Sequence, residues 1–91
     1  MVEGYLDYLQ KAQQQRKRAG EIKTNDDVSQ AKRDFLLKMA ERNETMAEVQ
    51  MRKDAGQPTA PATSAIKLID AELVAIKDRL DKLGISVKRK R

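Results

Sequence analysis

Residues 64–84, SAIKLIDAELVAIKDRLDKLG, carry the most regular pattern in the chain. Isoleucine or leucine recurs at alternating spacings of three and four residues over three heptads, which is the a/d repeat of a helix that packs along one seam. The pattern predicts a coiled-coil-like helix over residues 64–83. Its expected packing positions are Ile66, Ile69, Leu73, Ile76, Leu80 and Leu83.

Both ends of this helix carry recognisable signals. Ser64 is a candidate N-cap, because its hydroxyl can accept a hydrogen bond from the first turn. Gly84 can take the left-handed conformation that ends a helix, and Ile85 can then fold back onto Leu80. The glycine is therefore expected to stop the packing helix and release the basic end of the chain.

The repeat does not determine which surface packs on this seam. Leucine at a and isoleucine at d favour association beyond the dimer if copies of the helix assemble in parallel. An amphipathic helix that packs within its own chain, or on another protein, has the same pattern. Leu68 and Val74 flank the seam on opposite sides, so contact with more than one neighbouring helix is expected.

A second, longer helix is predicted over residues 25–54. Thr24 or Asn25 can cap its start, and acidic residues follow where they favour a helix N-terminus. A heptad seam continues along it, although Lys32 and Arg42 occupy two of the seam positions. The apolar members of the seam are Val28, Phe35, Met39, Met46 and Val49.

Two further features belong to this second helix. Leu36 and Leu37 widen its seam near the middle, so that part is expected to pack most closely. Charged residues four apart are expected to pair on its exposed side, and these are Asp34 with Lys38 and Glu48 with Arg52.

The first predicted helix, residues 2–19, is amphipathic only in its first half. Its narrow apolar stripe consists of Val2, Tyr5, Leu6, Leu9 and Ala12. Residues 13–18 are entirely polar up to Gly20, and this half is expected to be solvated or to touch a polyanion.

The clearest boundary in the chain is the stretch AGQPTAPAT at residues 55–63. Gly56, Pro58 and Pro61 cannot continue a helix and favour an extended path. A linker of this length can place the last helix about 25 Å away or let it fold back. The predicted organisation is a two-helix region at 1–54, the linker at 55–63, the heptad helix at 64–84 and a basic tail at 85–91.

The composition predicts an all-α protein without a large independent globular core. The chain has 91 residues, of which 36% are charged and 3% aromatic. Ala, Leu, Glu, Lys, Arg and Gln are plentiful, which is typical of long exposed helices. A chain this short buries only about 60% of its unfolded surface, so partners are expected to add stability.

Several residue types that catalysis commonly needs are absent from the chain. Without cysteine or histidine it has no thiolate nucleophile, no zinc-thiolate site and no imidazole proton shuttle. We therefore expect no enzyme, no cofactor, no metal and no small-molecule substrate. No apolar run approaches the roughly 18 residues of a membrane span, and the N-terminus lacks signal-peptide character. The expected location is intracellular or inside a virion, not secreted.

The net charge of +5 lies at the two ends of the sequence. Residues 1–24 carry +2, residues 25–56 carry −1, residues 57–83 carry 0 and residues 84–91 carry +4. Dense cation clusters contact phosphates without reading bases, although a solubilising or targeting tail and an acidic protein surface are alternatives. The candidate polyanion-binding residues are Arg16, Lys17, Arg18, Lys88, Arg89, Lys90 and Arg91.

Together these features predict a non-enzymatic structural component of a larger complex, of the virion or ribonucleoprotein type. Its amphipathic helices would dock on protein subunits or on other copies, and its basic ends would contact nucleic acid, either DNA or RNA, through phosphates. One alternative is a small oligomeric nucleic-acid-binding regulator. Another is an adaptor or inhibitor that presents a helix to one partner protein.

Overall fold

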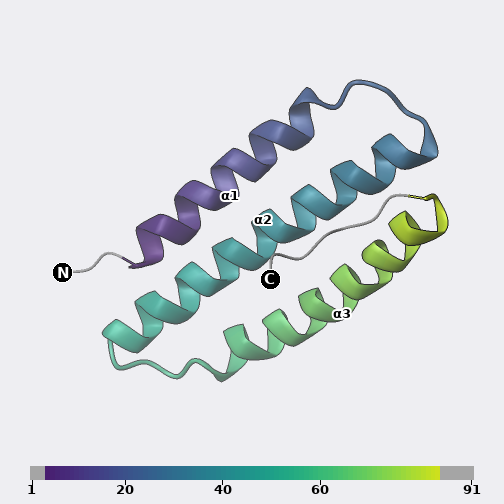
Figure 1. The fold of residues 1–91 in the computed structure, drawn as a ribbon. Coiled ribbons are helices and arrows are strands. Elements are labelled where there is room, and N and C mark those ends of the chain that lie inside the picture. Colours follow the sequence, from purple (N-terminus) through teal and green to yellow (C-terminus); the bar gives the residue numbers. More distant parts are fainter. Residues whose placement is uncertain (1–3, 85–91) are drawn as a thin grey trace, which may run out of the picture.

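The chain forms three α-helices that run up, down and up (Figure 1). A computed structural model describes residues 4–84 and contains α1 (Gly4–Glu21), α2 (Asp27–Asp54) and α3 (Ala60–Lys82). No described residue belongs to a strand, and the principal extents are 44 × 26 × 23 Å. The prediction of an all-α fold with elongated helices is confirmed. The predictions for residues 1–3 and 85–91, including Val2 and Ile85, lie outside the described residues.

The linker is shorter than predicted, because α3 begins at Ala60 and not at residue 64. Pro61 lies in the first turn of α3. A helix tolerates proline there, since the first backbone N–H groups have no partner within the helix and the fixed φ of proline suits it. The prediction that Pro61 continues an extended path is therefore wrong. Ser64 lies inside the helix, and Thr59 occupies the N-cap position without a side-chain capping bond.

The start of α2 also differs in detail from the prediction. Asp26, in an extended conformation, occupies the N-cap position ahead of Asp27, and it makes no side-chain capping bond. The predicted caps were Thr24 and Asn25. The hydroxyl of Thr24 instead lies against the hydroxyl of Ser29. The acidic start was correctly read as a helix beginning, but the helix starts two residues later than predicted.

Arg33 holds the connection between α1 and α2 against the side of α2. Its guanidinium donates hydrogen bonds to the backbone carbonyls of Ile22 and Thr24, both at 2.9 Å, and to Oδ1 of Asn25 at 3.2 Å. Loop carbonyls that no helix satisfies thus find donors from a side chain. These contacts set the sharp reversal between α1 and α2.

Gly84 ends α3 as the sequence predicts. Its φ of 86° is left-handed, and its N–H donates to the carbonyl of Asp81 at 3.0 Å. This bond is one of the two that define a Schellman stop. The predicted contact between Ile85 and Leu80 lies outside the described residues.

The end of α2 uses the same device in full. Gly56 has a φ of 71°, and its N–H donates to the carbonyl of Lys53 at 3.1 Å. The N–H of Gln57 donates to the carbonyl of Arg52 at 2.7 Å, which completes a Schellman motif. This stop turns the chain sharply, so that α3 runs back along α2.

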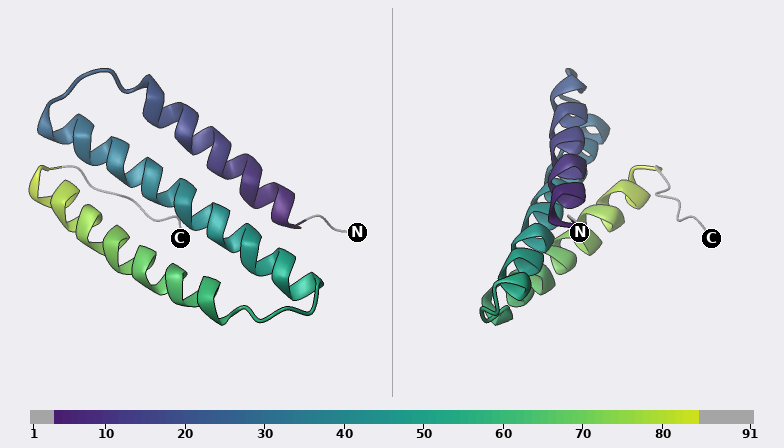
Figure 2. Two further views of the ribbon diagram at one scale, coloured as in Figure 1. Left: turned by 180° about the vertical axis from the view of Figure 1, so that it is seen from behind. Right: turned by 90° about the vertical axis from the view of Figure 1, so that its left-hand side faces the viewer.

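The three helices form an open layer with α2 in the middle (Figures 1 and 2). Both α1 and α3 pack on α2, and within the described residues they make no contact with each other. A closed three-helix bundle would bring every helix against the other two. The interior is correspondingly thin, since no large side chain among the described residues is fully buried. This confirms the prediction that the chain has no large independent globular core.

The predicted seam of α3 packs on α2. On α3, Ile69, Leu73 and Leu80 are buried, while Ile66, Ile76 and Leu83 are half-buried. Because α3 contacts no other described helix, α2 of the same chain covers this seam. The apolar seam residues of α2 are all half-buried, and they are Val28, Phe35, Met39, Met46 and Val49.

The interface between α1 and α2 was not predicted, and it is built from alanine. Ala12 and Ala19 lie seven residues apart on the buried side of α1. On α2, Ala40 and Ala47 flank Asn43, and all three are buried. Small side chains at this spacing let two helices approach closely.

The predicted solvation of the second half of α1 is therefore only partly correct. Ala19 is buried, and α1 stays packed on α2 to its last turn. The amide of Asn43 donates to Oε1 of Gln15 at 2.8 Å, so the polar half of α1 contributes a hydrogen bond to the interface. A glutamine bonded in this way satisfies the buried amide of its neighbour.

Candidate docking groove and cationic clusters

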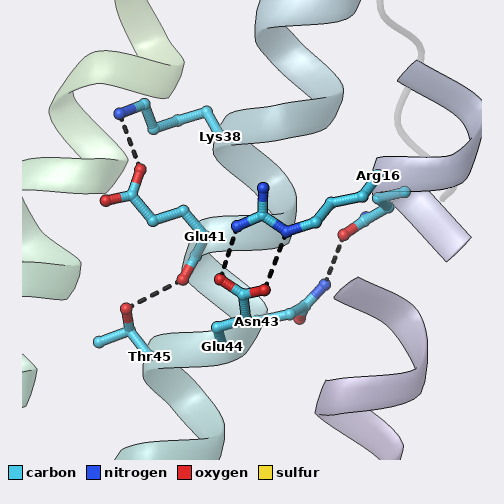
Figure 3. A network of polar contacts seen from close by, with 7 residues as sticks. Arg16, Lys38, Glu41, Asn43, Glu44 and Thr45 are labelled. Atoms are coloured by element: carbon cyan, nitrogen blue, oxygen red, sulfur yellow. Dashed lines mark hydrogen bonds and ion pairs between the residues drawn. The ribbon is translucent and has the colours of Figure 1, made fainter. Parts of the chain in front are cut away.

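Arg16, a predicted polyanion contact, is bound by an acid of its own chain (Figure 3). Its Nε donates to Oε2 of Glu44 at 2.9 Å, and its Nη2 donates to Oε1 at 2.7 Å. This bidentate hydrogen bonding raises the pKa of Arg16 and lowers the pKa of Glu44. A phosphate would have to displace this carboxylate, which already accepts two hydrogen bonds from the guanidinium of Arg16.

Lys17 and Arg18, the next two candidates, are exposed on α1. Neither forms an ion pair with another residue of the described range. The up-down-up order brings the end of α1 and the end of α3 to the same end of the layer (Figure 1). Gly84, the last described residue, therefore lies at the same end of the layer as the last turns of α1, although α1 and α3 do not pack on each other. The predicted contacts Lys88, Arg89, Lys90 and Arg91 lie outside the described residues.

Acidic residues share this end of the molecule. Glu21 ends α1, while Asp26 and Asp27 begin α2. The neighbouring polar groups of Ser29 and Thr24, with Ser29 contributing most, lower the pKa of the Asp26 carboxyl. The cations of α1 are therefore partly balanced by neighbouring acids.

A groove of about 510 Å³ draws on all three helices. Its apolar part consists of Leu37, Ala75 and Ile76, and Leu37 remains 40% exposed. The rest of the lining is charged, with equal numbers of acids and cations. These charged residues are Arg16, Asp34, Lys38, Glu41, Glu72 and Arg79.

Ion pairs fix most of these charges along the groove. Lys38 Nζ lies 2.7 Å from Oε1 of Glu72 on α3 and 2.9 Å from Oε1 of Glu41 on its own helix. Both contacts, with that to Glu72 first, raise the pKa of Lys38. Arg79 of α3 reaches Oδ2 of Asp34 on α2 at 2.9 Å. With its charges paired and equal in number, the groove offers an apolar strip and no net attraction for a polyanion.

These pairings differ from those that the sequence predicts. Asp34 and Lys38 do not pair with each other, because each finds a partner on α3. The predicted pair of Glu48 with Arg52 is present at 2.9 Å.

Of the two charged residues that interrupt the α2 seam, Arg42 lies against α3. Its Nε donates to Oδ1 of Asp70 at 2.6 Å. The sequence contains the matching charges, but nothing in the local pattern of α2 or α3 shows which residues will face each other.

The outer side of α3 carries large apolar side chains with no covering helix. Leu68 is 70% exposed and Val74 is 58% exposed. The sequence predicts contact of these residues with a second neighbouring helix. No described helix provides that contact, because α3 packs only on α2. They are the two most exposed large apolar side chains of residues 4–84.

Within residues 4–84, no group of three or more acids is positioned to hold a metal ion. The helices of the same range are too short or too polar to cross a membrane. Comparison with protein-family models, with curated proteins and with solved structures finds no match.

Proposed function

We propose that this chain is a non-enzymatic helical component of a larger assembly, which docks on protein subunits through its open layer and contacts polyanion through its basic end. The observation that carries the docking role is the missing contact between α1 and α3. Two helices laid on either side of a third leave both broad faces of the layer uncovered, and apolar faces of helices are normally buried against another element.

Exposed apolar side chains on each helix support this role. Leu6 of α1, Leu37 and Met51 of α2, and Leu68 and Val74 of α3 are all at least 40% exposed. Scattered single residues would need no explanation, but Leu37 lies in a groove between neighbouring helices. A partner helix with an apolar ridge fits this groove, because the groove has no net charge and its ion pairs line an apolar strip.

The basic end supports the polyanion role. Residues 1–84 carry 15 cations and 14 acids, so residues 85–91 supply four of the five excess charges. These seven residues follow Gly84 in the sequence, and α3 ends at the same end of the layer as α1, which carries the exposed Lys17 and Arg18 (Figure 1). Clustered cations bind phosphates by releasing counterions, irrespective of sequence. The same proposal places the protein inside a cell or a virion, where protein subunits and nucleic acid meet.

The native mass of the complex formed by the full-length chain, measured after nuclease treatment, tests the docking role. A defined complex with other protein subunits should form, and Leu37→Asp should abolish it, since an ionised carboxylate is costly to bury. Gln14→Asp on the exposed side of α1 is the matched control and should leave the complex intact. A chain that is found only at its own mass of 10.3 kDa would overturn the proposal.

A further inference from the structure

The outer side of α3 carries a short stripe that α2 does not cover. Lys67, Ala71, Val74 and Asp78 are exposed and follow spacings of four, three and four residues. Residues at these spacings lie above one another on a single face of a helix. This stripe lies apart from the seam of α3 that packs on α2, in which Leu73 and Leu80 are buried.

The two charges of the stripe lie at its opposite ends and have opposite signs. Lys67 and Asp78 are separated by eleven residues, which is about three helical turns or 16 Å, so they lie almost in line along the helix. Neither forms an ion pair with any residue of the range 4–84. Within the described residues, both charged groups are therefore available to a partner, with small and apolar side chains between them.

We propose that the occupant of this stripe is the α3 stripe of a second copy, packed antiparallel about a two-fold axis between residues 72 and 73. This inference rests on the proposed function and names one of the protein partners as the chain itself. A two-fold contact must be self-complementary. In the antiparallel arrangement Lys67 of each copy meets Asp78 of the other, so the contact contains two opposite-charge pairs.

The apolar positions agree with the same arrangement. About the same axis, Ala71 of one copy faces Val74 of the other, and the small alanine allows the helices to approach closely. On the flank, Leu68 of one copy lies beside Ala75 of the other, a large side chain against a small one. A parallel arrangement would instead place Lys67 against Lys67 and Asp78 against Asp78, which is unfavourable. The charges therefore select the antiparallel dimer.

The decisive test mixes two charge-reversal variants of the full-length chain. Lys67→Glu and Asp78→Lys each convert both pairs of the homodimer into repulsions, so each variant should self-associate about tenfold more weakly than the original chain. In an equimolar mixture both pairs become attractive again. The two variants should then form a heterodimer with an affinity close to that of the original dimer, measured by analytical ultracentrifugation.

Further variants separate this contact from general charge effects and from folding. The double variant carrying both reversals should regain the homodimer, whereas Lys11→Glu on the exposed side of α1 should change nothing. Circular dichroism should show equal helicity for all of them, because every substituted residue is exposed.

Three results would overturn the inference: an original chain that stays monomeric up to about 1 mM, single variants that dimerise as well as the original, or a mixture that fails to form the heterodimer. The loss of subunit docking in Leu37→Asp is measured separately. If no dimer forms, the docking experiment still tests the proposed function independently.

Discussion

Arg16 of α1 and Glu44 of α2, which lie 28 positions apart in the sequence, form a bidentate ion pair. Nε of Arg16 lies 2.9 Å from Oε2 of Glu44, and Nη2 lies 2.7 Å from Oε1. The pair joins the polar half of α1 to the middle of α2 (Figure 3). It also withdraws one cation from the cluster that the sequence assigns to polyanion binding. Arg16 thus stabilises the packing of α1 on α2. Any binding of a polyanion by α1 would depend on the neighbouring Lys17 and Arg18.

The pair predicts a modest loss of stability in acid. Hydrogen bonding to Arg16 holds the pKa of Glu44 below its ordinary value of 4.5. The stabilisation is therefore present above pH 4.5, and it is lost as the pH falls below 4.5 through the folded-state pKa. Both side chains are more than a third exposed, so the effect on the free energy of unfolding should be below about 1 kcal/mol.

Urea unfolding of the original chain, Glu44→Gln, Arg16→Gln and the double variant at pH 7 and pH 3 measures this effect. The variants should lose stability at pH 7 and little more in acid, and the double variant should resemble either single one. Additive losses from the two substitutions would show that the pair is not coupled.

Truncation of the α3 seam should be costly. Leu73 is 7% exposed and faces α2, so Leu73→Ala removes apolar contacts and leaves a cavity. We expect a loss of about 2–3 kcal/mol in the free energy of unfolding, at the lower end of the range for buried leucine because the layer is thin. Leu68→Ala, the same substitution at a 70% exposed position, should change it by less than about 0.5 kcal/mol in dilute solution. Equal losses would contradict the observed orientation of α3.

The alanines between α1 and α2 predict the opposite kind of sensitivity. Ala47 is buried where the two helices approach closely, so Ala47→Leu should force them apart and cost about 1–3 kcal/mol. Ala71→Leu, at an exposed position of α3, is the control and should be nearly neutral in dilute solution, where the proposed dimer is dissociated. Chemical denaturation followed by circular dichroism compares the two. A stabilising effect of Ala47→Leu would contradict close packing at this position, because it would mean that the interface accommodates a larger side chain.

The basic tail should dominate the salt dependence of polyanion binding. Removal of residues 88–91 should flatten the log-log slope for duplex DNA by up to about 3.6, at about 0.9 per phosphate contact. Replacement of Lys17 and Arg18 by glutamine should flatten it by at most about 1.8, and by less if the neighbouring acids already screen them. Binding to unrelated duplex and single-stranded sequences between about 50 and 200 mM salt gives both slopes. An unchanged slope after truncation would assign the tail to solubility, targeting or a protein partner.

Local patterns were sufficient for the helices themselves. The spacing from Ile66 to Leu83 predicts a helix with one packing seam, and Gly84 predicts where it stops. Both signals act within a few residues, because a helical face and a left-handed glycine are local properties of the backbone. Pro61 shows the limit of such reading, since the same residue starts a helix or breaks one according to its place in the turn.

The candidate groove could not be predicted in the same way. Leu37 was recognised as part of a widened seam, yet it is left exposed because α1 and α3 lie on either side of it. The pairs of Lys38 with Glu72 and of Asp34 with Arg79 join residues 34 and 45 positions apart. Their partners depend on how two whole helices are aligned, and a pattern within one helix does not contain that alignment.

By itself, then, the sequence determined three amphipathic helices, their stops and a charge excess confined to the ends. The tertiary structure decided that α3 folds back on α2, so that the seam of α3 is covered by its own chain. It also directed the ends of α1 and α3 to the same end of the layer and left the outer side of α3, with Leu68 and Val74, uncovered. The physical reason is that helix formation depends on neighbours a few residues apart, whereas the choice of a packing partner depends on the fit of two surfaces and on the turn that joins them.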